Sequence, residues 1–155
     1  MARYTASLET QLPPADAVAY LSDFSTTEEW DPGVVEAERL GDGPVGAGSE
    51  FRVVAEFLGR TSTLVYRIVE FVPGETVTLR GENATVVSLD RITCEPSNGG
   101  TRVTYDADLA LKGPLRIADP LLGLAFNRVG ERALEGLRGT LARKATPAAA
   151  SGGDR

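Results

Sequence analysis

The order of hydrophobic patterns along the chain constrains its fold more strongly than any single motif. A strand-like segment comes first (residues 3–12), and a short helical stretch that ends near Trp30 follows it. Alternating segments then run from 35 to 111, and a long amphipathic stretch runs from about 114 to 144. A long helix that follows a sheet can lie across it and enclose a cavity. The order therefore indicates an α+β fold that can hold a small apolar molecule.

Apolar and polar residues alternate at every second position in the strand-like segments, as they do in half-buried strands. Turns rich in Gly, Pro and Asn separate the later segments, so we expect neighbouring strands to pair antiparallel in a meander. The predicted strands are 3–12, 35–40, 50–57, 61–72, 76–81, 86–95 and 101–111.

The same alternation predicts which side chains of the sheet face the long helix. A shift of one residue in a strand would turn the whole set to the other face. The residues expected on the helix side are Phe51, Val53, Ala55, Phe57, Leu64, Tyr66, Ile68, Val103, Tyr105, Ala107 and Leu109.

Helical spacing predicts two short helices after the first strand, at about 15–24 and 26–30, and one long helix at the C-terminal end. At about 100° per residue, the long helix has an apolar stripe that drifts sideways along its length, which suits a helix crossing a curved sheet. The tail 146–155 is rich in Ala, Gly and Ser and is expected to be disordered, which leaves one domain over 1–145. The stripe consists of Ala118, Leu122, Ala125, Val129, Ala133, Leu137 and Leu141.

Charge and hydropathy argue against several classes of partner. The net charge of −6 disfavours nucleic acid and anionic membrane surfaces, because both attract basic faces. No apolar run approaches the roughly 18 residues of a membrane span, so we expect no transmembrane segment. The only cysteine, Cys94, cannot form an intramolecular disulfide, and a cytoplasmic, reducing compartment fits best.

The residue inventory also removes much catalytic chemistry. The 155 residues include no histidine, so there is no Ser-His-Asp triad, Cys-His pair or imidazole metal site. Cys94 lies in an alternating apolar run and is interpreted as a small buried residue, not as a nucleophile. The glycine-rich segment 41–48 lacks a Gly-Lys-Ser/Thr ending and leads into a strand, so it is not a phosphate loop. No metal or nucleotide cofactor is expected.

Five segments, each weak alone, occur in an order that resembles the START/SRPBCC superfamily over about residues 2–144. This is the helix-grip fold of birch-pollen-allergen-like proteins and of polyketide cyclase/dehydrase and lipid transport domains. The resemblance implies a curved antiparallel sheet of about seven strands wrapped on a long C-terminal helix, with two short helices after the first strand. The five segments are Pro14–Phe24, Glu29–Val34, Arg67–Pro73, Gly99–Tyr105 and Arg128–Leu137.

The superfamily includes carriers of sterols, lipids and hormones, aromatase/cyclases that act on polyketides, and activators of chaperone ATPases. It has no universal catalytic motif, so the resemblance assigns no catalytic residue here. It does imply that part of the face between sheet and helix lines a pocket. The candidate ligand-binding residues are Trp30, Phe51, Val53, Phe57, Tyr66, Tyr105, Ala125, Val129 and Arg132.

Some of these candidates carry polar groups, and each has a structural alternative. The phenols of Tyr66 and Tyr105 can orient a ligand or simply bond to the backbone. Arg132 can face an anionic head group or pair with a neighbouring glutamate. Asp90 and Arg91 lie on opposite faces of one strand, so one of them points inward. An inward Asp90 would have a raised pKa and be a functional candidate.

Three functions remain open at this point. The first is binding of a small hydrophobic or aromatic ligand, which requires a pocket of several hundred Å³, on the order of typical ligand sites. The second is a cyclase/dehydratase-type enzyme, which requires ionisable groups that face each other inside the pocket. The third is a protein-interaction module, which requires a filled interior and an exposed apolar patch.

Overall fold

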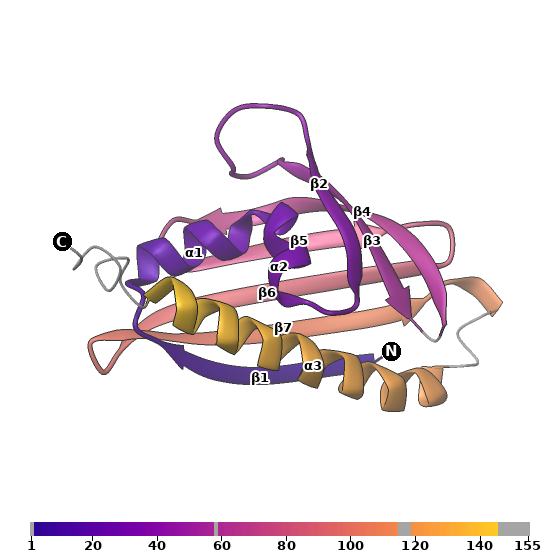
Figure 1. Cartoon of the computed structure of the whole chain (residues 1–155). Coiled ribbons are helices and arrows are strands. Elements are labelled where there is room, and N and C mark those ends of the chain that lie inside the picture. The colour runs from indigo at the N-terminus through magenta and orange to yellow at the C-terminus, as the bar shows by residue number, and fades with distance from the viewer. Residues whose placement is uncertain (1, 58, 115–118, 146–155) are drawn as a thin grey trace.

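A computed structural model describes residues 2–57, 59–114 and 119–145 of the chain (Figure 1). A seven-stranded sheet forms one layer, and the helices form the other. The strands are β1 (Ala2–Thr10), β2 (Val34–Leu40), β3 (Glu50–Phe57), β4 (Arg60–Val72), β5 (Thr76–Glu82), β6 (Val86–Ser97) and β7 (Gly100–Leu111). The helices are α1 (Pro14–Ser22), a 3₁₀ turn (Phe24–Thr26), α2 (Thr27–Trp30) and α3 (Asp119–Ala145).

The strand order is β1-β7-β6-β5-β4-β3-β2, and every neighbouring pair is antiparallel. Strands β2 to β7 therefore form the predicted meander, and each follows its neighbour through a short connection or loop. Between β6 and β7 the turn contains Asn98 (φ 49°) and Gly99 (φ 81°), whose left-handed backbone suits a tight hairpin. The first strand pairs with the last one, with Leu8 opposite Val103.

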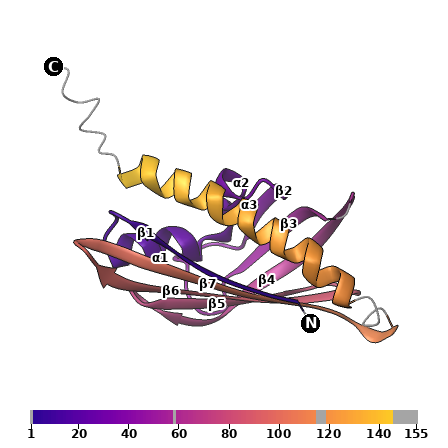
Figure 2. The same ribbon diagram turned by 90° about the horizontal axis from the view of Figure 1, so that it is seen from below.

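Helix α3 crosses one face of the sheet, and α1 and α2 lie on the same face (Figure 2). It packs against β1 and α2, whereas α1 packs against the central strands β5, β6 and β7. The predicted helix residues 115–118, including Ala118, and the tail 146–155 fall outside the described residues. No helix in the described ranges is long and apolar enough to cross a membrane.

Burial confirms the predicted inward face of the strands. Val53, Ile68 and Val103 are buried, whereas Val65 and Val69 on the opposite face of β4 are exposed. The side chain of Phe57 falls outside the described part. The alternation therefore identified the inward face of β3, β4 and β7 correctly.

The core is densest at one end of α3. Leu137 and Leu141 are fully buried there, together with Val18 and Leu21 of α1. Towards the beginning of α3 the described side chains are only partly buried, and Leu124 is 71% exposed. The interior is thus closely packed beneath the C-terminal half of α3 and less so beneath its N-terminal half.

Candidate functional site

A cavity of about 180 Å³ lies between α3 and the sheet, partly open to the surface. It is smaller than the several hundred Å³ expected from the sequence. The aromatic lining consists of Tyr4, Phe24, Trp30, Tyr66, Tyr105 and Phe126. The described polar side chains in the lining are Thr27, Asp31, Glu56, Ser62, Ser88 and Asp90.

The structure brings five of the nine candidate residues together around this cavity. They come from α2, β3, β4, β7 and α3, so every layer of the fold contributes to the wall. Their role in ligand binding stays a prediction. The five are Trp30, Val53, Tyr66, Tyr105 and Val129.

Three of the other candidates, Phe51, Ala125 and Arg132, do not line the cavity. Phe51 is fully buried in the core, with its ring 6.4 Å from that of Phe24. Arg132 is exposed on α3, and neither it nor Ala125 is among the lining residues. The face of α3 that meets the cavity includes Val129, Ala133 and Leu137 of the predicted stripe, together with Phe126 and Gly130, which the stripe did not include. The side chain of Phe57 is not in the described part.

A buried carboxylate lies at the centre of the polar lining. Asp90 on β6 is 7% exposed. Its Oδ1 accepts a hydrogen bond from Ser88 Oγ (2.8 Å), and its Oδ2 accepts one from the Tyr105 hydroxyl (2.6 Å). Burial raises the pKa of Asp90 to about 6; the two hydrogen bonds act against this rise, and the negative charges of Asp31 and Asp108 add to it.

The two inward tyrosines share this environment. Burial, with the nearby charge of Asp90, raises the pKa of both Tyr66 and Tyr105 well above the usual value. A hydrogen bond with Ser88 partly opposes the effect at Tyr66. Ser88, Asp90, Tyr105 and Tyr66 therefore form one buried polar group, in which both phenols stay protonated at neutral pH.

A second carboxylate lies at the corner that follows α2. Asp31 Oδ1 accepts a hydrogen bond from the backbone N–H of Gly33 (2.8 Å) and so caps the turn that follows α2. Asp31 also lines the cavity, and burial raises its pKa. The negative charge of Asp31 helps to raise the pKa of Asp90, which lines the same cavity.

Trp30 precedes this corner and is 4% exposed. Its ring lies edge-on to Tyr105, with centroids 6.1 Å apart. The indole Nε1 is buried and has no hydrogen-bond partner in the part of the chain that the structure describes. A buried donor in this state costs free energy unless another molecule supplies an acceptor.

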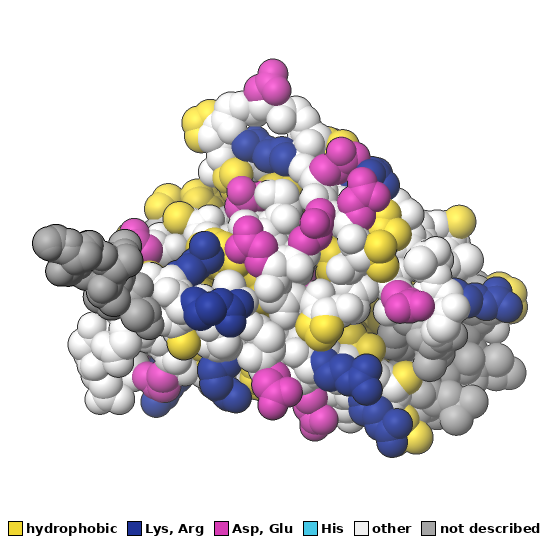
Figure 3. Space-filling model, viewed as in Figure 1, with side chains coloured by type: hydrophobic (Ala, Val, Ile, Leu, Met, Phe, Trp, Pro, Cys, Tyr) yellow, Lys and Arg dark blue, Asp and Glu magenta, His cyan; other side chains and the backbone are white. Residues whose placement is uncertain are grey.

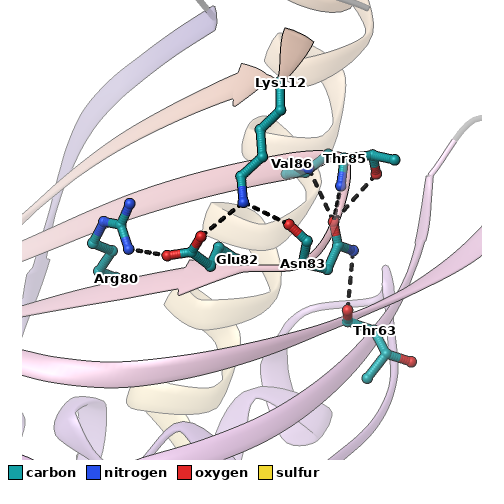
Figure 4. A network of polar contacts seen from close by, with 7 residues as sticks. All are labelled: Thr63, Arg80, Glu82, Asn83, Thr85, Val86 and Lys112. Atoms are coloured by element: carbon teal, nitrogen blue, oxygen red, sulfur yellow. Dashed lines mark hydrogen bonds and ion pairs between the residues drawn. The ribbon is translucent and has the colours of Figure 1, made fainter.

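A polar network supports the sheet next to the cavity (Figure 4). Asn83 Oδ1 accepts hydrogen bonds from the backbone N–H groups of Thr85 and Val86 (both 2.9 Å), and its Nδ2 donates to the Thr63 carbonyl (3.0 Å). Lys112 Nζ donates to Glu82 (2.7 Å) and to the carbonyl of Asn83. These bonds join β4, β5, β6 and the end of β7, and they fix the position of Val86, a lining residue.

Surface charge is distributed unevenly. Acidic side chains gather over α2 and β2, whereas both signs are interspersed along α3 (Figure 3). Arg52 pairs with Glu36 and Glu38 on the β2 side. Within the described ranges, no group of three or more Asp, Glu or Cys residues is arranged to hold a metal ion.

Sequence reasoning did not single out Ser88 or Glu56 as cavity residues. Ser88 and Asp90 are two residues apart on one strand, so an inward Asp90 implies an inward Ser88. That signal was available in the alternation. Glu56 lines the cavity from the end of β3, next to the backbone of Gly33, and no residue pattern distinguishes it from an ordinary exposed glutamate.

An antiparallel sheet that wraps on one long helix around an apolar cavity defines the helix-grip class of the START superfamily. The chain belongs to the family described as polyketide cyclase / dehydrase and lipid transport, whose model matches residues 1–142. This confirms the START/SRPBCC resemblance noted in the sequence. Among curated proteins no relative matches the chain.

Solved structures share the fold at low sequence identity. A START superfamily protein from Mycobacterium smegmatis is 14% identical with a TM-score of 0.76, over 91% of this chain and 97% of that chain. The Zhui aromatase/cyclase from Streptomyces sp. R1128 is 15% identical with a TM-score of 0.77, over 95% and 96%. A protein from Thermus thermophilus is 17% identical with a TM-score of 0.75, over 90% and 96%. At these identities the likeness establishes the fold alone.

Proposed function

We propose that this protein binds a small, largely aromatic or apolar molecule in the cavity between the sheet and α3. The observation that carries the proposal is the cavity itself, an apolar space of about 180 Å³ with a few buried polar groups on one wall. Sites for small molecules have this composition, because apolar walls supply affinity and a few polar groups fix orientation. The family, which includes lipid-transport domains, supports the same function.

The second candidate is a cyclase/dehydratase-type enzyme. It is favoured by the ionisable groups that face the cavity, above all Asp90 and Tyr105, and by the likeness to an aromatase/cyclase. The pKa of about 6 for Asp90 would suit a general base near neutral pH. A cavity of about 180 Å³ is small for folding a long reactive chain, so we favour binding over catalysis.

The third candidate, an interaction module, requires a filled interior. The unfilled space beneath the N-terminal half of α3 argues against it. The lone Cys94 supports a reducing, cytoplasmic compartment.

Two measurements on the full chain test the proposal. Native mass spectrometry of freshly purified protein, followed by extraction, should reveal a retained small hydrophobic compound. An NMR titration with 2-phenoxyethanol, a neutral aromatic probe, should shift the signals of Trp30, Val53 and Tyr105.

The variant Ala107→Phe fills the cavity from β7 and should abolish these shifts, because Ala107 is a lining residue. The matched control Leu124→Ala changes an exposed side chain of α3 and should leave them unchanged. Shifts that persist in Ala107→Phe, or that appear only outside the cavity, would contradict the proposal.

A further inference from the structure

The described charged residues that line the cavity are all of one sign. Among the described lining residues there are three carboxylates, Asp31, Glu56 and Asp90, and no lysine or arginine. The charged groups that act on Asp90 are Asp31 and Asp108, and both are acidic. Arg91, the next residue along β6, points to the other face and pairs with Glu70. The buried carboxylate of Asp90 thus has hydrogen bonds but no counter-charge within the described ranges.

Aromatic side chains line the same cavity as this carboxylate. The hydroxyl of Tyr105 donates a hydrogen bond to Asp90, and the ring of Trp30 lies edge-on to that of Tyr105. Tyr66 and Tyr4 complete the aromatic part of the wall. Aromatic faces attract cations through their negative quadrupole, most strongly where water is excluded. Carboxylate and aromatic rings together suit an ammonium group better than a neutral or anionic one.

The wall of the cavity holds a second buried polar group, the indole N–H of Trp30, which has no hydrogen-bond partner among the described residues. This nitrogen is buried, and its side chain lines the cavity. A hydrocarbon ligand would leave this donor without an acceptor and the Asp90 carboxylate without a counter-charge. A guest that carries a hydrogen-bond acceptor as well as a positive charge would satisfy the two groups.

On the basis of the proposed binding function, we propose that the cavity selects a small aromatic amine, bound as its ammonium form, which also carries one hydrogen-bond acceptor. The ammonium group pairs with Asp90 among the aromatic rings, and the acceptor receives the indole N–H of Trp30. The aromatic part of the guest fills the apolar space between Val53, Ala107 and Val129.

Folding has already removed Asp90 from water, which favours this pairing. An ammonium guest loses only its own hydration when it meets a carboxylate that is already desolvated. A neutral guest leaves that carboxylate without a counter-charge. An anionic guest adds repulsion with Asp90 and Asp31 in a medium of low dielectric constant.

The test compares probes that share a ring and an ether oxygen but differ in the head group. Dissociation constants of 2-phenoxyethylamine, 2-phenoxyethanol and phenoxyacetate are measured on the wild-type full chain by NMR titration at pH 7.5. The amine should bind about tenfold more tightly than the alcohol, since a charge-assisted hydrogen bond replaces a neutral one, and phenoxyacetate should bind most weakly. The probe 3-phenylpropylamine, in which CH₂ replaces the ether oxygen, should bind several-fold more weakly than 2-phenoxyethylamine.

The variant Asp90→Asn should weaken amine binding by about tenfold and change alcohol binding by less than about threefold. The matched control Asp106→Asn removes the same charge from the outer face of β7, where Asp106 bonds to Arg3 and Thr5, and should leave amine binding unchanged. The wild-type ranking decides the proposal even if Asp90→Asn fails to fold.

Each result has a distinct meaning. If the alcohol or phenoxyacetate binds at least as tightly as the amine, the amine proposal is wrong while the proposed binding function stands. If 3-phenylpropylamine binds as tightly as 2-phenoxyethylamine, the role assigned to Trp30 is wrong. If none of the probes binds in the cavity, both this inference and the proposed function fail.

Discussion

Asp90 is the residue whose environment is most unusual for its type, and its pKa sets a stability prediction. The pKa rises from 3.8 to about 6 on folding. The folded state therefore holds the proton more tightly, and the stabilisation from this group is complete below pH 4 and is lost as the pH rises through 6. The change is about 2–3 kcal/mol, from about 1.4 kcal/mol per pKa unit.

We therefore expect Asp90→Asn to gain stability relative to the wild type, by about 2–3 kcal/mol, as the pH rises from 4 to 7.5. The measurement is urea unfolding of both chains at several pH values. Subtracting the free energy of unfolding of the wild type from that of Asp90→Asn removes the contribution of all other titrating groups. A difference that does not change with pH would contradict the assigned burial of the carboxylate.

Cys94 gives a second prediction at this scale. Its thiol is buried on β6, and burial raises its pKa to about 12. Because the thiolate is the reactive form, we expect no detectable reaction with a disulfide reagent at pH 8 in the native protein and complete reaction after unfolding in guanidinium. Rapid labelling of native protein would mean that β6 opens readily or that Cys94 is exposed.

The sequence predicted the polar side chains of the site only in part. Alternation placed Tyr66 and Tyr105 on the inner face, since apolar neighbours on their strands share that face. It did not decide between Asp90 and Arg91, because β6 has apolar residues on both faces and Leu89 is 41% exposed. Pairing with β7 resolves the choice, as it sets Asp90 opposite the buried Ala107.

At the scale of elements, two glycines determine how closely α3 approaches the rest of the fold. A Cβ at Gly136 would overlap the backbone carbonyl of Trp30, and one at Gly130 would lie 2.6 Å from the Tyr4 ring. The absence of a side chain at these positions lets α3 lie against α2 and β1. This contact also positions Trp30 in the cavity wall.

We expect Gly136→Ala to destabilise the protein by about 1–3 kcal/mol, because the clash with rigid backbone outweighs the gain in helix propensity. The matched control is Gly123→Ala in the same helix, where a Cβ meets no heavy atom within 4 Å. It should stabilise by about 0.5–1 kcal/mol, the propensity difference alone. Thermal and urea unfolding measure both. Equal effects of the two substitutions would show that the close approach at Gly136 is not as described.

The sequence predicted the boundaries of the strands closely, but it predicted the orientation of α3 less well. Strand β3 has the predicted bounds, and most others differ by one or two residues, because turn residues and alternation are local signals. The apolar residues of α3 are spread over more than one face, and Leu124 is mostly exposed. The stripe included Ala133, which lines the cavity, but it also included Ala125, which lies beside the cavity, and it omitted Phe126.

At the scale of the whole molecule, one long-range pairing decides the shape. Strand β1 pairs with β7 about a hundred residues later, so the chain ends its sheet beside the place where it began. Local patterns contain no information on this pairing, because it joins segments that lie far apart in the sequence. The pairing places β1 beneath α3 and so supplies Tyr4 to the cavity wall.

The uneven packing of the molecule predicts uneven protection from hydrogen exchange. Leu137 and Leu141 of α3 are fully buried in the core, whereas the residues of 123–134 that line the cavity are only partly buried. In the empty protein we expect amides of 123–134 to exchange at least about tenfold faster than those of 137–141, because local opening there exposes little apolar surface. Saturating 2-phenoxyethylamine should slow exchange in 123–134 markedly, since the ligand binds only the closed form. Equal protection along α3 without ligand, or no change on adding it, would mean that the cavity is not a separate, weakly held part of the fold.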